Sequence, residues 1–269
     1  MIRLGPRAKA FLPTNSVCIF ADVITSAQEA RLVEELAPVL SSKPYLRSHW
    51  DNVIVGYREV DRPVWQSQEN EATVAGIRNI ITEFVASEAA RSGLLPDDPV
   101  CRPLGFTGEW LPAHVVDLAE DGFITPHVDS VVSAGGLVCG LSLLSTAVMV
   151  LRPQDPNLAT DLEARVEMLL PRRSLYVLSQ NARYSFAHSI EPKVDLVFQA
   201  PNQAGSDSRE TPDEMLAAMA KGAKRERRIS LILRDTVDGA PFGEQPHEAL
   251  MRELKKEAAR THRAGNKVK

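Results

Sequence analysis

The second half of this 269-residue chain consists of short apolar segments separated by glycine, proline, asparagine or serine. From about residue 109 onward seven or eight such segments follow one another: AHVVDLA, FITPHVD, LVCGLSLL, AVMVL, RVEMLL, SLYVLSQ, RYSFAHSI and RRISLILRD. Many short strands with turn residues between them are typical of a β-sandwich or jelly roll. The step Glu120-Asp121-Gly122 predicts a hairpin turn between the first two strands, because Asp-Gly favours tight turns.

The first part of the chain predicts helices instead. Ser26 and Glu29 have the spacing of a capping box, and apolar residues follow at helical spacing, which predicts a helix over about 26–40. A second apolar repeat that starts at Val74 predicts a helix ending near Gly93. The expected fold class is α+β, with N-terminal helices packed on the β core.

Composition favours one globular domain. Hydrophobic residues make up 44% of the chain and charged residues 25%, and the net charge of −4 argues against a uniformly basic nucleic-acid binder. No apolar run is long enough to span a membrane, and three scattered cysteines form neither a disulfide framework nor a zinc ribbon. We expect a monomer with its domain over 22–240, interrupted by a polar insertion at about 201–225.

Both ends of the chain are basic. The first 21 residues contain Arg3, Arg7 and Lys9 and no acid, which resembles a mitochondrial transit peptide, although a frayed N-terminus would have the same composition. Residues 241–269 predict a basic helix or tail, which we interpret as a solvated end rather than a partner site. We therefore expect a mitochondrial leader over 1–21 and a location in the mitochondrial matrix.

The segment FITPHVD contains a His-x-Asp step that could begin a metal site. Residues two apart on a strand face the same side, so His127 and Asp129 can point into one barrel mouth. His188 could supply a third ligand. Two imidazoles and one carboxylate leave coordination positions open, the usual arrangement of non-haem Fe(II) that activates oxygen with a co-substrate. Zinc in a hydrolase is the competing metal, because it accepts the same ligands.

The segment RRISLILRD places two arginines on one face of a strand. Arg228, Ser230, Ile232 and Arg234 share this face, while Ile229, Leu231 and Leu233 share the other. Buried arginines are costly in free energy unless anions meet them, and a guanidinium fork could bind a small dicarboxylate. The alternative is that the arginines pair with protein carboxylates, for which Asp129 is a candidate near Arg234.

These residues, in this order and on strands, resemble the AlkB family of Fe(II)- and 2-oxoglutarate-dependent dioxygenases. The resemblance covers about residues 17–235 without the insertion, and is carried by HWDNVIVGYRE, HVVDLAEDGFITPHVDSV, GLSLLS, SLYVLSQNARYSFAHSI and RRISLILR. These segments look like the mitochondrial branch of the family. The resemblance implies a double-stranded β-helix (jelly-roll) core, an Fe(II) cofactor, and 2-oxoglutarate and O2 as co-substrates.

The resemblance also implies a reaction and roles for individual residues. The reaction would hydroxylate or oxidatively demethylate a mitochondrial protein or RNA, with links to programmed necrosis and fatty-acid metabolism. His127, Asp129 and His188 would be the catalytic metal ligands. Arg228 would bind the distal carboxylate of 2-oxoglutarate, and Arg234 would lie near its metal-bound end.

The co-substrate pocket departs from the family pattern. DNA-repair members carry an asparagine and a tyrosine at the positions of Val116 and Leu118, and an asparagine at the position of Ser230. The resemblance therefore implies a more apolar pocket, in which Tyr176 or Tyr184 would supply a missing hydroxyl. We include Tyr184 with Ser230 among the expected co-substrate contacts, although either tyrosine could instead be a core aromatic.

Two other functions stay open from the sequence: a jelly-roll binding or regulatory protein with a non-catalytic metal site, and a cupin-like metal hydrolase. Neither needs two arginines for a dicarboxylate, so Arg228 and Arg234 favour the dioxygenase. The substrate class is undecided. Lys221, Lys224, Arg225 and Arg227 could contact RNA phosphates, whereas aromatics such as Trp50 and Trp65 would suit a protein substrate.

Overall fold

The computed structural model describes residues 2–13, 15–48, 52–62, 64–92, 103–158, 160–191 and 226–237. The elements within these ranges are β1 (Ile2–Leu4), α1 (Ala8–Phe11), β2 (Val17–Phe20), α2 (Ser26–Ser41), β3 (Ile54–Arg62), α3 (Gln68–Ser92), the 3-10 helix η1 (Pro103–Gly105), β4 (Ala113–His127), β5 (Val138–Leu143), β6 (Ala147–Pro153), the 3-10 helix η2 (Leu162–Ala164), β7 (Val166–Leu170), β8 (Leu175–Leu178), α4 (Gln180–Tyr184), β9 (Phe186–Ile190) and β10 (Arg228–Arg234).

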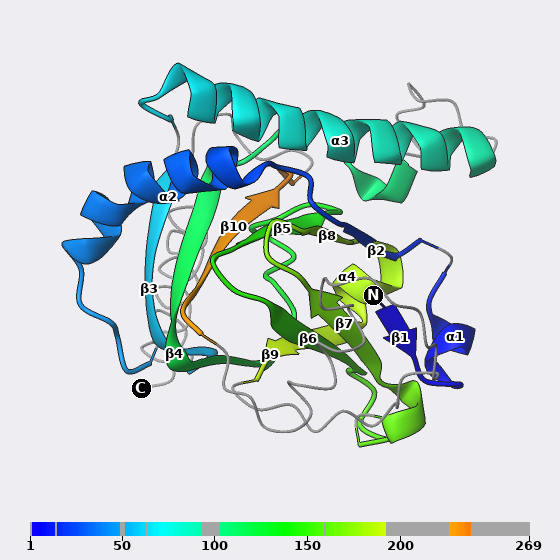
Figure 1. Ribbon diagram of the computed structural model, residues 1–269. Helices are drawn as coiled ribbons and strands as arrows, with labels where there is room; N and C mark the ends of the chain where they lie inside the picture. The colour runs from blue at the N-terminus through cyan, green and yellow to red at the C-terminus, as the bar shows by residue number, and fades with distance from the viewer. Residues whose placement is uncertain are drawn as a thin grey trace, which may run out of the picture.

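The strands form one antiparallel sheet that folds over on itself. Its order is β1-β7-β6-β9-β4-β10-β5-β8-β2, with β3 paired to β4. Helices α2 and α3 lie across one side of this sheet (Figure 1). The predicted class, helices packed on a jelly-roll core, is therefore confirmed.

The sheet buries a separate hydrophobic core on each face. In the outer core, Leu36 of α2 and Ile77 of α3 pack with Leu231 of β10. In the inner core, Leu118 of β4 packs with Met168 of β7 and other residues of the folded-over strands. Helices cover the outer face and strands cover the inner face, so the central strands are buried on both sides.

The alternation along β10 follows the sequence pattern. Ile229, Leu231 and Leu233 belong to the outer core. Arg228 and Ser230 alternate with them and are also buried, which places them on the inner face. The predicted division of this strand into an apolar face and an arginine-bearing face is therefore correct.

The capping box of α2 lies one residue earlier than predicted. Thr25 and Gln28 form it: the Gln28 amide donates to Thr25 Oγ1 (3.2 Å), and the Thr25 amide donates to Gln28 Oε1 (2.8 Å). The predicted pair, Ser26 and Glu29, is wrong. Glu29 is buried and instead accepts a hydrogen bond from the Leu144 amide (2.8 Å), which ties α2 to the connection between β5 and β6.

The predicted turn at Glu120-Asp121-Gly122 is also wrong, because β4 runs through it as one strand of 15 residues. Strand β3 pairs with β4 on both sides of this point, with a register irregularity between Val55 and Tyr57. A side chain at Gly122 would collide with the backbone carbonyl of Gly56. The glycine therefore permits two strands to approach closely at a bulge and does not reverse the chain.

Strand β4 joins the two layers of the fold. Strand β3 follows it on one edge, and on the other edge its first half pairs with β10 and its end pairs with β9, where Ile124 faces Ile190 and His127 faces His188. The strand crosses from one layer to the other as it approaches the His-x-Asp step. The fold thereby brings His127 beside a strand that lies 61 residues further along the chain.

The predicted domain boundaries are only partly within the described residues. In the segment expected as a leader, β1 pairs with β7 and β2 pairs with β8, so a leader over 1–21 would include both end strands of the sheet order. The leader stays a prediction. The insertion at 201–225 and the tail at 241–269 lie outside the described residues, and no helix described here is long and apolar enough to cross a membrane.

We expect Gly122→Ala to lower the free energy of unfolding by about 1–3 kcal/mol, because the added methyl group overpacks the bulge between β3 and β4. Gly76→Ala is the matched control, since a side chain at this position in α3 meets no atom within 4 Å. It should leave stability unchanged or raise it by up to about 1 kcal/mol, because alanine favours helices. Urea denaturation of both variants measures this, and a Gly122→Ala protein as stable as wild type would contradict the close approach.

Candidate metal centre

Two histidines and one aspartate converge where β4 meets β9. His127 and His188 are register partners, and their ring centroids lie 4.2 Å apart at an interplanar angle of 50°. Asp129 follows β4 by two residues, and its Oδ1 lies 3.2 Å from His127 Nε2 and 3.5 Å from His188 Nε2. The three possible ligand atoms lie within 4.8 Å of one another. Donor atoms at this spacing can bind one metal ion, since each metal–ligand bond is about 2 Å long.

The backbone orients the His127 ring for metal binding. Its Nδ1 lies 2.9 Å from the carbonyl oxygen of Thr125. A carbonyl oxygen can only accept, so Nδ1 carries the proton and Nε2 presents its lone pair toward Asp129. A metal-binding histidine commonly donates its second ring nitrogen to a carbonyl or carboxylate in this way.

The protonation states also suit a metal ion. Burial, together with the nearby His127, lowers the pKa of His188 to about 4, so its imidazole is neutral at pH 7. Burial alone would raise the pKa of Asp129, but the neighbouring His127, His188 and Arg234 lower this pKa well below its usual range. Neutral imidazoles and an ionised carboxylate are the forms that bind metals.

Arg228 lies in the inner core, and no described carboxylate pairs with it. Its side chain is 2% exposed, and its Nη2 donates to Ser142 Oγ at 2.8 Å. Nε has no hydrogen-bond partner, and within the described ranges no carboxylate forms an ion pair with this guanidinium. Burial accordingly lowers the pKa of Arg228. A buried cation with one hydroxyl partner has donors left for an anion, as the dicarboxylate hypothesis requires.

The apolar positions expected in the co-substrate pocket lie beside Arg228. Leu118 of β4 is the register partner of Arg228, and Val116 is the partner of Ser230. Both apolar side chains are buried in the inner core. Ser230 is also buried and faces Ser142 on β5. The wall next to Arg228 is therefore apolar on β4 and hydroxyl-bearing on β5.

The two candidate tyrosines differ in position. Tyr176 belongs to the inner core and is the register partner of Gly140, where any side chain would overlap its ring. Burial raises the pKa of Tyr176, so its hydroxyl stays protonated. Tyr184 is 44% exposed, and its hydroxyl donates to Gly135 O at 3.4 Å. Tyr176 is thus the better placed of the two, and a co-substrate contact from Tyr184 stays a prediction.

Arg234 lies beside the metal-binding group. Its Nη1 is 3.9 Å from Asp129 Oδ2, so the predicted proximity of these residues is correct. This distance is too long for a hydrogen bond, and both side chains are partly exposed. Arg234 therefore stands next to the carboxylate without a hydrogen bond to it, as would suit a residue near the metal-bound end of a co-substrate.

The basic and aromatic residues proposed to contact a substrate are only partly within the described residues. Arg227 donates to both oxygens of buried Asp117 at 2.9 Å, and its contact with RNA phosphates stays a prediction. Trp65 is 6% exposed and belongs to the outer core, so it is not an exposed aromatic. Lys221, Lys224, Arg225 and Trp50 lie outside the described residues.

Sequence reasoning missed two residues that the fold brings to the site. Ser142 lies on β5, and only the pairing of β5 with β10 places its hydroxyl against Arg228. Arg183 lies five residues before His188 and is buried beside Asp129. Its position in a short helix next to a ligand strand was a signal, but its partners are backbone atoms that no sequence pattern identifies.

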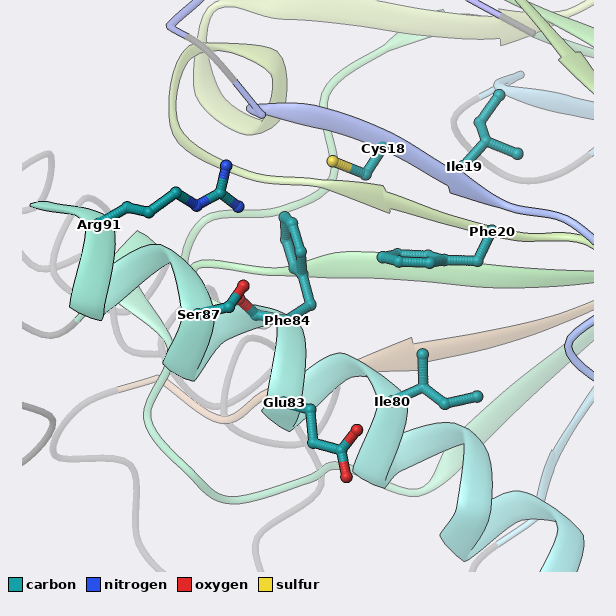
Figure 2. Close-up of a pocket in the computed structure, with 8 residues that line it drawn as sticks. All are labelled: Cys18, Ile19, Phe20, Ile80, Glu83, Phe84, Ser87 and Arg91. Atoms are coloured by element: carbon teal, nitrogen blue, oxygen red, sulfur yellow. The ribbon is translucent and has the colours of Figure 1, made fainter.

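A cavity of about 500 Å³ lies elsewhere, between β2 and α3 (Figure 2). Phe20, Phe84 and Cys18 line it, and none of the three metal-binding candidates does. Burial raises the pKa of Cys18 to about 11, so its thiol is not a nucleophile at neutral pH. Arg91, at one end, pairs with Glu88. The cavity is therefore separate from the chemistry of the metal centre.

Known proteins resemble this chain in sequence and in fold. It is 36% identical over 168 residues to the Mus musculus protein named alpha-ketoglutarate-dependent dioxygenase alkB homolog 7, mitochondrial, which is 62% of this chain and 63% of that protein. It is 32% identical over 222 residues to the Bos taurus protein of the same name, covering 82% of this chain and 79% of the relative.

A prolyl-4-hydroxylase from Pseudomonas putida has a similar structure, with a TM-score of 0.50 and 11% identity over 87% of this chain and 99% of that one. This likeness concerns the fold alone. No model of a known protein family matches the chain. The sequence similarity to the bovine relative confirms the predicted resemblance, and the chain belongs to the AlkB homolog 7 group of alpha-ketoglutarate-dependent dioxygenases.

Proposed function

We propose that this dioxygenase binds Fe(II) through His127, Asp129 and His188 and uses 2-oxoglutarate and O2 to hydroxylate or oxidatively demethylate a mitochondrial protein or RNA. One observation carries the proposal: Arg228 is a buried guanidinium without a described carboxylate partner, on the inner face of the sheet that also bears the metal-binding group. A non-catalytic metal site or a metal hydrolase would not need this cation.

Each of the three metal-binding residues has a separate role in the proposal. His188 would contribute the nitrogen of a neutral imidazole, His127 would contribute Nε2, and Asp129 would contribute the anionic ligand. The carbonyl of Thr125 keeps the His127 ring in the binding orientation. Fe(II) held by these three residues would supply the activation of oxygen.

The inner core provides the proposed site for 2-oxoglutarate. Arg228 would pair with the distal carboxylate, and the Ser142 hydroxyl would keep the guanidinium plane oriented. Val116 and Leu118 are buried on the neighbouring strand and would exclude water from the carbon chain of the co-substrate. Excluding water strengthens the ion pair, because the local dielectric constant is low.

Asp129→Ala should weaken Mn(II) binding by more than about 100-fold, because loss of a ligand costs more than loss of a residue that only orients one. Titration calorimetry with Mn(II), a redox-stable substitute for Fe(II), measures this. Asp61→Ala is a matched control, since Asp61 also pairs with a histidine, His114, at 2.8 Å but lies outside the metal-binding group. Equal Mn(II) affinity in the two variants would remove Asp129 from the site.

Arg228→Ala should raise the 2-oxoglutarate concentration needed for half-maximal succinate formation roughly 10- to 150-fold, since a charge-assisted pair is worth about 1.5–3 kcal/mol. Arg228→Lys should recover little, because lysine lacks the planar fork. Arg227→Ala is the control: it lies next in sequence but pairs with Asp117, so the co-substrate requirement should not change. Unchanged affinity in Arg228→Ala would mean that the dicarboxylate binds elsewhere.

Succinate release from 2-oxoglutarate with Fe(II), screened against mitochondrial RNA and mitochondrial protein fractions, tests the substrate class. A true substrate fraction should accelerate release, and prior nuclease or protease treatment should abolish the effect for the corresponding class. If no succinate forms under any condition with bound Fe(II), the proposed dioxygenase reaction is wrong.

We further propose that the enzyme works in the mitochondrial matrix. The names of its relatives, which include the word mitochondrial, support the organelle, and the acid-free basic start of the chain, with Arg3, Arg7 and Lys9, is typical of import into the matrix. Microscopy of the full chain with a C-terminal fluorescent tag checks it, and a diffuse cytosolic signal would contradict it.

A further inference from the structure

A buried arginine contacts the loop that carries Asp129. We call residues 128–137, between β4 and β5, the Asp129 loop. Arg183 of α4 is 2% exposed and donates four hydrogen bonds, all to backbone carbonyl oxygens of this loop. The acceptors and distances are Asp129 O at 2.8 Å, Ser130 O at 3.2 Å, Ala134 O at 3.2 Å and Gly135 O at 3.3 Å.

The partners of Arg183 are unusual for a buried cation. In the part of the chain that the structure describes, no carboxylate forms an ion pair with it. Burial lowers its pKa, since water no longer solvates the charge. The four carbonyl dipoles offset this cost. Because all of them belong to one loop, the buried charge acts on the conformation of that loop.

A second anchor holds the other end of the Asp129 loop. The buried carboxylate of Asp235 accepts hydrogen bonds from the amides of Gly136 (3.2 Å) and Leu137 (2.9 Å), and the backbone oxygen of Asp235 accepts from the Gly135 amide (2.9 Å). Asp235 directly follows Arg234 at the end of β10. The loop is thus fixed between α4 and β10.

We propose that Arg183 is a positioning residue for the metal ligand Asp129. Arg183 precedes His188 in the chain and binds the loop that carries Asp129, so it links the two segments that supply these ligands. It would keep the Asp129 carboxylate beside both imidazoles before the metal binds, which avoids the entropy cost of ordering the loop on binding. This inference rests on the proposed metal site.

Two variants separate this role from a purely electrostatic one. Arg183→Lys keeps the charge but loses the planar donors that reach four carbonyls, whereas Arg183→Met keeps a long side chain without any donor. Both should weaken Mn(II) binding by about 10- to 100-fold, the usual effect of losing a residue that orients a metal ligand. At saturating Mn(II), the affinity for 2-oxoglutarate should be unchanged, because Arg228 remains in place.

Arg165→Lys is the matched control for lost stability. Arg165 is also buried, pairs with Glu167, and lies next to β7, apart from the metal-binding group. Its replacement should lower the melting temperature while Mn(II) affinity stays that of wild type. Wild-type affinity in Arg183→Lys would overturn the inference, and so would an equal loss of affinity in Arg165→Lys.

Amide hydrogen exchange on the metal-free wild-type protein gives a test that needs no variant. The amides of Ala134 and Gly135 should exchange slowly, because the loop is already fixed. Exchange at the rate of an unprotected peptide would overturn the role of Arg183 even if its variants fail to fold. If wild type does not bind Mn(II) at all, the proposed metal site is wrong, while slow exchange would still show a fixed loop.

Discussion

The pairing of His127 with His188 is the constraint on which the site depends. Strand β4 starts between β3 and β10 and ends against β9, so its last residues belong to the opposite layer of the fold. A strand that stayed in one layer would leave the two imidazoles on separate sheets. Asp129 lies two residues beyond the end of β4, so the same pairing also brings its carboxylate beside both imidazoles.

Polar groups buried in an apolar core oppose folding unless they have hydrogen-bonding partners. The buried charged residues near this site differ in how many such partners they have. Asp129 meets two imidazoles and has Arg234 nearby, and Arg183 meets four carbonyls. Among the residues that the structure describes, Arg228 meets one hydroxyl. Of these three groups, the one with the fewest partners is the one assigned to the co-substrate, so binding of an anion there would stabilise the folded protein as well as prepare it for reaction.

The sequence predicted features that depend on local periodicity. Alternation along β10 separated Arg228 from Ile229, and the strand segments marked the jelly roll correctly. Features that depend on register between distant strands could not be predicted. The contact of Arg228 with Ser142 requires the alignment of β10 with β5, which local patterns do not specify.

Local signals also failed where two interpretations had the same spacing. Thr25 and Gln28 satisfy the capping-box pattern as well as Ser26 and Glu29 do, and only burial of Glu29 decides between them. Asp-Gly favours a turn, but the sequence alone could not show that Gly56 of β3 lies against Gly122 at the bulge. In both cases tertiary packing selected the outcome.

The two strands nearest the start of the chain have a consequence for how the protein folds. Strands β1 and β2 occupy the two ends of the sheet order and pair with β7 and β8, which are synthesised more than 150 residues later. Such pairings raise the contact order, and high contact order slows folding. During synthesis these first strands stay unpaired until β7 and β8 have been made. Unpaired strand edges can pair with other chains, so we expect the nascent chain to be prone to aggregation during this time.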